Sequence, residues 1–126
     1  MILFIFLIFV LIGCQKIGAL SEEYSKFFGV ITLNSNSYFS NSGYLNEGDT
    51  IDFGFYATET NILKFFIADE DNFNKWKNNE NAQFIVSYDN IREIDLKQPI
   101  VKSGKYYVVV LNSSTRQKVF IRTKKI

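Results

Sequence analysis

The side chains best suited to covalent chemistry in this sequence are a single cysteine, Cys14, and thirteen carboxylates. The chain contains no histidine, so imidazole acid–base catalysis, serine–histidine nucleophile activation and histidine-ligated zinc are excluded by composition. A cysteine thiolate is a strong nucleophile and a suitable site for acylation. If Cys14 is acylated, no thiol remains for a disulfide, a metal ion or catalysis, because the chain has no other cysteine.

The stretch from Asp69 to Asn72 gathers hard oxygen atoms that could bind Ca²⁺. An EF-hand loop needs further oxygen ligands, a glycine and a distal glutamate at fixed spacing, and these do not follow. Acids first, then Lys75 and Lys77, is instead the charge order of a short helix. We therefore predict that Asp69 or Asp71 caps a helix, keep both as secondary candidate metal ligands, and expect no cofactor.

Four aromatic side chains fall at positions where the sequence predicts exposure, and such rings could stack on sugar rings. They are Tyr38, Tyr44, Tyr56 and Trp76. Single surface aromatics are common, and Trp76 shares a predicted helix face with Phe73, so core packing is the alternative for Trp76. These four residues are the candidate ligand-binding aromatics.

Charge patterning supplies further hypotheses. A pair of carboxylates could hydrolyse a glycoside, but no spacing among the acids singles out a pair. Cations without acids at the end of the chain suit either protection of an edge strand or contact with an anionic lipid or polysaccharide. They are Arg116, Lys118, Arg122, Lys124 and Lys125. The formal net charge is only +1, without the excess of basic residues that nucleic-acid binding usually requires, so we expect no nucleic-acid partner.

Residues 2–12 are all Ile, Leu, Phe or Val. A helix of this length spans about 18 Å, less than the ~30 Å hydrocarbon core of a bilayer. A processing signal is therefore favoured over a permanent membrane span, although no Lys or Arg precedes the apolar run as is usual in signal peptides. The alternative is a buried apolar strand or helix with an incidental cysteine.

The sequence Leu11-Ile12-Gly13-Cys14 resembles the lipobox of bacterial lipoproteins. The resemblance implies cleavage between Gly13 and Cys14 and a diacylglyceryl thioether on Cys14. It also implies a domain held by lipid on a membrane of the cell envelope, outside the cytoplasm. The predicted organisation is a signal peptide at 1–13, a tether at 14–23 and one domain at 24–126.

Within the domain, polar turns separate short apolar segments. The clearest strand is 50–58, where Ile51, Phe53, Phe55 and Ala57 share one face. The nearly continuous apolar run 62–68 predicts a central strand buried on both faces. Further strands are predicted at 24–33, 37–45, 83–88, 92–96, 105–111 and 118–123, with 83–88 and 92–96 forming a hairpin.

Seven to eight strands with one short helical turn near 70–78 predict an all-β fold. The expected architecture is an antiparallel β-sandwich of jelly-roll type.

Three segments of the domain are similar to the strand-and-turn pattern of GOLD-type β-sandwich domains. They are also similar to small secreted bacterial β-sandwiches related to carbohydrate-binding and pre-peptidase modules. The segments are 45–53, 67–69 leading to Trp76, and 104–112. Golgi-trafficking GOLD proteins carry a cysteine pair, which this sequence lacks, so cargo transport is not implied. The resemblance implies a binding module.

Together these features predict a lipid-anchored envelope protein that acts as a binding or structural module for a protein or glycan partner. We expect no catalytic residue and no enzymatic activity. The alternative is a small glycan-acting hydrolase or an accessory carbohydrate-binding module.

Overall fold

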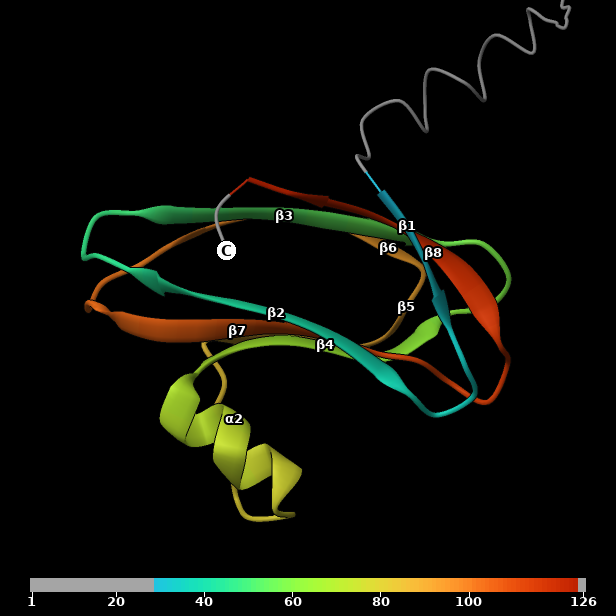
Figure 1. The fold of residues 1–126 in the computed structure, drawn as a ribbon, viewed down its shortest axis with the longest axis horizontal. Coiled ribbons are helices and arrows are strands. Elements are labelled where there is room, and N and C mark those ends of the chain that lie inside the picture. Colours follow the sequence, from blue (N-terminus) through green and yellow to red (C-terminus); the bar gives the residue numbers. More distant parts are fainter. Residues whose placement is uncertain (1–28, 125–126) are drawn as a thin grey trace, which may run out of the picture.

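The computed structural model describes residues 29–124, which form eight strands and one helix in two layers (Figure 1). The elements are β1 (Gly29–Leu33), β2 (Tyr38–Leu45), β3 (Thr50–Ala57), β4 (Ile62–Asp69), α2 (Glu70–Lys77), β5 (Val86–Ile91), β6 (Glu93–Pro99), β7 (Gly104–Leu111) and β8 (Gln117–Thr123). The predicted all-β sandwich with one short helix is confirmed. The predicted signal peptide, Cys14, the tether and the first part of the 24–33 strand lie outside the described residues.

The two sheets have the strand orders β1-β8-β3-β6 and β2-β7-β4-β5, and every neighbouring pair is antiparallel. β1 pairs with β8, β2 with β7, β3 with β6 and β4 with β5. The first half of the described chain therefore pairs with the second half in reverse order. A chain doubled back in this way and wrapped into two layers is a jelly roll, as predicted.

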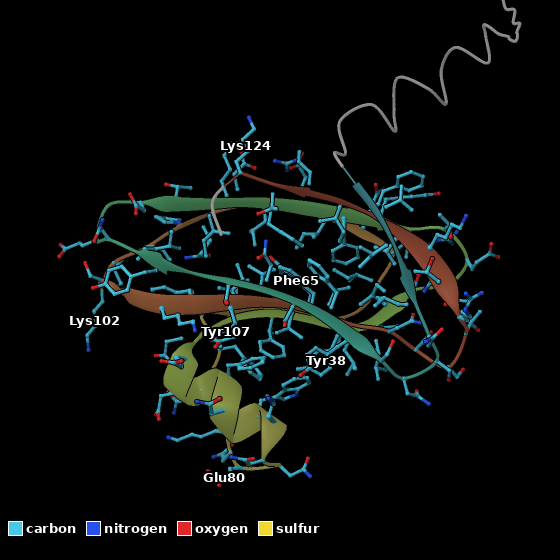
Figure 2. The ribbon with its side chains drawn as sticks, viewed as in Figure 1. Tyr38, Phe65, Glu80, Lys102, Tyr107 and Lys124 are labelled. Carbon is cyan, nitrogen blue, oxygen red and sulfur yellow. The ribbon has the colours of Figure 1, made fainter. Side chains whose placement is uncertain are left out.

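The main core lies between the sheets and is built from alternate residues of the central strands. Ile51, Phe53, Phe55 and Ala57 have no exposed surface, which confirms the predicted period of two in β3. The ring of Phe65, on β4, lies 5.6 Å from that of Phe53 and 5.7 Å from that of Phe55, centroid to centroid. Figure 2 shows Phe65 between the two sheets.

Helix α2 lies on the outer face of the β2-β7-β4-β5 sheet, below it in Figure 1. Asp69 caps the helix, because its Oδ1 accepts the backbone N–H of Asn72 at 2.9 Å. Asp71 is not the cap: it lies inside the first turn, where its carboxylate meets Lys75 one turn later at 3.5 Å. No helix within residues 29–124 is long and apolar enough to cross a membrane.

The predicted hairpin between 83–88 and 92–96 is wrong. β5 pairs with β4 and β6 pairs with β3, so the two strands belong to different sheets. Asn90, whose φ is 59°, bends the chain just before it passes from one layer to the other. Alternation shows which face of a strand is buried but not which strand it pairs with. β6 is the last strand of one sheet, next to β3, and β5 is the last strand of the other, next to β4.

Candidate functional site

A cavity of about 440 Å³, lined by both polar and apolar groups, opens on the β1-β8-β3-β6 sheet near one end of the sandwich. The β1–β2, β3–β4 and β7–β8 turns all lie at this end, on the right in Figure 1. We call this cavity the end pocket. Its lining residues are Thr32, Thr58, Glu59, Thr115, Arg116, Gln117, Lys118 and Phe120.

Strand pairing places Lys118 of the end pocket between two threonines of the lining. Alternation along β8 turns Lys118 and Phe120 outward, whereas Val119 between them is buried. Thr32 on β1 lies opposite Lys118 in register. On the other side, the backbone N–H and the hydroxyl of Thr58 donate to the carbonyl oxygen of Lys118 at 3.1 and 2.8 Å. A threonine therefore flanks Lys118 on each neighbouring chain segment.

Two buried amide side chains hold the surrounding turns in place. Gln117 Nε2 donates to Asn112 Oδ1 at 2.8 Å, and Gln117 Oε1 accepts the backbone N–H groups of Glu59 and Thr60 at 2.9 and 3.1 Å. Asn112 Nδ2 lies 2.8 to 3.1 Å from three carbonyl oxygens, those of Leu33, Asn34 and Thr115. This network joins all three turns, so the walls of the end pocket are held rigidly.

Phe120, the aromatic residue of the lining, lies near one of the predicted aromatics, Tyr56, which is not itself a lining residue. The ring of Phe120 lies 6.5 Å from that of Tyr56, centroid to centroid. The guanidinium carbon of Arg92 lies 5.8 Å from the Tyr56 ring centroid, and Arg92 itself donates to the carbonyl oxygens of Ala57 and Thr58 at 2.6 and 2.8 Å. Tyr56 thus supports the wall of the end pocket.

The other three predicted aromatics lie on the opposite sheet or its helix. Tyr38 is 39% exposed and meets Trp76 edge-on, with ring centroids 5.2 Å apart and planes at 82°. Trp76 also packs against Phe66 at 4.9 Å, as the core-packing alternative expected. Tyr44 is 69% exposed and lies six residues after Tyr38 on the same face of β2, about 20 Å away at strand spacing. The four residues do not form one platform.

Arg122 lies between two carboxylates on the β1-β8-β3-β6 sheet, with Nη1 donating to Asp52 and Nη2 to Asp95. Gly54 makes room for it, since a Cβ there would lie 3.0 Å from Arg122 Nη2 and from the carbonyl oxygen of Ile94. The hydrogen bond from Arg122 lowers the pKa of Asp52. Asp52 is therefore ionised at neutral pH, which suits an ion pair better than the general acid of a glycosidase. The sequence signal for this cluster was a glycine inside a strand.

The basic end of the sequence is divided between two environments. The expectation that these cations protect an edge strand is wrong, because β8 lies between β1 and β3. Arg122 and Lys124 pair with Asp52, whereas Arg116 and Lys118 line the end pocket. Lys125 lies outside the described residues.

The candidate metal ligands Asp69 and Asp71 are engaged as helix cap and as partner of Lys75. Within residues 29–124, no three or more His, Cys, Asp or Glu side chains come together in a group that could hold a metal ion.

No family model matches this sequence. No curated protein matches it either. Among solved structures, the chain is similar to the pre-peptidase C-terminal domain of a collagenase from Bacillus anthracis, with 12% sequence identity and a TM-score of 0.49. The match covers 78% of this chain and 90% of that chain, and the likeness concerns the fold alone.

Proposed function

We propose that this chain is a non-catalytic binding module whose end pocket binds part of a glycan, and that a lipid on Cys14 holds it on a membrane of the cell envelope. The observation that carries the proposal is the end pocket itself, with hydroxyl groups and an aromatic ring on a rigid frame. Its volume of about 440 Å³ falls in the range of small-molecule sites, about 300–1,000 Å³.

The lining suits a sugar because a sugar ring presents hydroxyls at its edge and C–H groups on its faces. The hydroxyls of Thr32 and Thr115 can donate and accept hydrogen bonds at the edge of such a ring. The hydroxyl of Thr58 donates to the carbonyl oxygen of Lys118, so it can accept from the sugar. Phe120 offers an aromatic surface for the apolar face. The amides of Asn112 and Gln117 hold these groups in position before the ligand arrives, which lowers the entropy cost of binding.

The same lining supports binding better than hydrolysis. Glycosidases use a pair of carboxyl groups, whereas Glu59 is the only acid that lines the end pocket. The hydrolase alternative therefore has no pair of acids at this cavity.

Binding by the end pocket is tested by titrating the full-length protein, purified in detergent, with a panel of oligosaccharides. Phe120→Leu keeps apolar bulk but removes the ring, and it should weaken binding about tenfold or more, a loss of ~1.4 kcal/mol. Tyr44→Leu, on the other sheet, is the matched control and should leave affinity unchanged. The proposal would be refuted if Phe120→Leu bound the glycan as the wild type does while Tyr38→Leu lost binding, because the glycan site would then lie beside α2.

Lipid anchoring is supported by the lipobox-like sequence ending at Cys14. Cys14→Ser should abolish incorporation of a palmitate probe and release the protein from the detergent phase. Normal labelling of the Cys14→Ser protein would contradict this part of the proposal.

A further inference from the structure

We infer that the glycan in the end pocket carries a singly charged anionic group, a carboxylate or a sulfate ester, which Arg116 and Lys118 bind. This inference rests on the proposed function of the pocket. Some cations in the described chain form ion pairs with carboxylates, and others do not.

Elsewhere on the domain, lysine and arginine side chains near carboxylates form ion pairs. The pairs are Lys64 with Asp89, Lys75 with Asp71, Lys105 with Glu70, Arg122 with Asp52 and Asp95, and Lys97 and Lys124 with Asp52. Arg116 and Lys118 have no such partner among residues 29–124, although Glu59 lines the same cavity. Lys77, Arg92 and Lys102 also form no ion pair within these residues, but Arg116 and Lys118 are two such cations that line one cavity.

The two cations are placed to act on one group. Residues two apart on an extended chain project to the same side and lie about 7 Å apart, so Arg116 and Lys118 can reach a shared anion. Arg116 Nε donates to Asn34 Oδ1 at 3.0 Å, which orients the guanidinium. Its terminal nitrogens keep the fork geometry that binds two oxygens of a carboxylate or a sulfate.

Glu59 sets the charge that the pocket accepts. The lining carries two cations and one acid, so its formal charge is +1. A carboxylate or a sulfate ester carries one negative charge and balances the lining. A phosphate monoester carries about −1.5 to −2 at neutral pH, so it would also be repelled by Glu59.

A membrane surface is the competing source of anions. Polybasic attraction to lipid typically uses clusters of about four to eight adjacent cations. On this sheet Lys97, Arg122 and Lys124 all pair with Asp52, and Arg122 also pairs with Asp95. Arg116 and Lys118 instead line a cavity of about 440 Å³. Two cations at a concave site suit one anionic group better than a flat bilayer.

The test compares one oligosaccharide backbone in neutral, uronic-acid, sulfated and phosphorylated forms, titrated calorimetrically into the full-length protein in detergent. The uronic-acid and sulfated forms should bind about tenfold more tightly than the neutral form, with an advantage that shrinks as salt rises. Arg116→Gln and Lys118→Gln should each remove most of that advantage, measured as the ratio of the affinities for the acidic and neutral forms. Lys102→Gln, an exposed lysine at the opposite end of the sandwich in Figure 2, is the control and should change nothing.

Glu59→Gln should raise affinity for the phosphorylated form more than for the uronic-acid form. Equal affinity for neutral and acidic forms, with Phe120→Leu still damaging, would overturn this inference and leave glycan binding intact. Loss of all binding sensitivity to Phe120→Leu would instead overturn the proposed function. Binding to vesicles of anionic phospholipid that depends on Arg116 and Lys118, without binding of acidic oligosaccharide, would assign the cations to the membrane and refute the inference.

Discussion

The two outer faces of the sandwich use strands with the same alternating pattern, yet within residues 29–124 they differ. One face is apolar and covered by α2, whereas no helix covers the other, which carries charged side chains and which we call the open face. On the covered face, Phe66 and Val109 have no exposed surface although they point away from the main core. Phe73 of α2 stacks on Tyr107 with centroids 3.9 Å apart and planes at 4°, and Figure 2 shows Tyr107 on the side of the sheet that faces α2. On the open face, Gly54 and Arg122 occupy outward positions of the central strands.

The difference shows that a large apolar side chain on an outer face must be covered, whereas charged side chains there need no cover. Burial of an aromatic ring contributes about 1.5–3 kcal/mol, so outward Phe66 requires a cover, and α2 provides it. The open sheet has no helix over it among residues 29–124, and there outward positions hold ion pairs and the end pocket. The covered face therefore contributes stability, and the open face is the one on which we propose that ligand binds.

The largest expected effect separates these roles. Phe66→Ala should lower the free energy of unfolding by about 3–5 kcal/mol, as much as Phe65→Ala in the main core, because both rings are fully buried. Urea denaturation measures both. A cost below ~1 kcal/mol for Phe66→Ala alone would mean that α2 is not packed on this sheet in solution.

A smaller loss of stability is expected from a substitution at Gly54, on the open face. Gly54→Ala places a Cβ 3.0 Å from the Arg122 guanidinium and from a backbone carbonyl, and overpacking of this kind costs about 1–3 kcal/mol. Gly29→Ala is the matched control, since a Cβ there meets nothing within 4 Å. Equal melting temperatures for the two variants would show that the Arg122 cluster can move aside without cost.

Loss of the helix cap should cost less stability than the Gly54 substitution. Asp69→Ala removes the acceptor for the Asn72 N–H and should cost about 0.5–2 kcal/mol, whereas Asp71→Ala removes one exposed pair with Lys75, worth about 0.5 kcal/mol or less. Thermal unfolding ranks the two variants. Melting in EDTA and in millimolar calcium should coincide, and stabilisation by calcium that disappears in Asp69→Ala or Asp71→Ala would make this turn a metal site.

The smallest expected effect is a change in how steeply the free energy of unfolding depends on pH. Arg122 lowers the pKa of Asp52 below its ordinary value of 3.8, so the ion pair stabilises the fold above that value. The contribution is lost as pH falls below about 4 and through the lower folded-state pKa. Asp52→Asn should therefore be less stable than the wild type at pH 7, with a smaller further loss on acidification. Parallel stability curves for the two proteins would contradict the assignment.

Local pattern predicted the parts of the fold that depend on single strands. The inward face of β3, the burial of β4 and the Asp69 end of α2 follow from spacing within a few residues. The partners of residues 83–96 did not follow, because pairing with β3 or β4 is decided by the whole topology. The end pocket was also missed, since Thr32, Thr58 and Lys118 meet only after the strands pair. The clue was the polar turn 112–115, whose Asn112 is fully buried.

The central claim, that ligand binds the open face at the end pocket, is tested most directly by an NMR titration. The isotopically labelled protein would be titrated with an acidic oligosaccharide while backbone amide shifts are followed. The account predicts shifts concentrated at Thr32, Thr58, Glu59 and residues 115–120, with the amides around Tyr38 and Trp76 unchanged. Shifts confined to Tyr38, Trp76 and their neighbours under α2, or no shifts across an oligosaccharide panel, would contradict it.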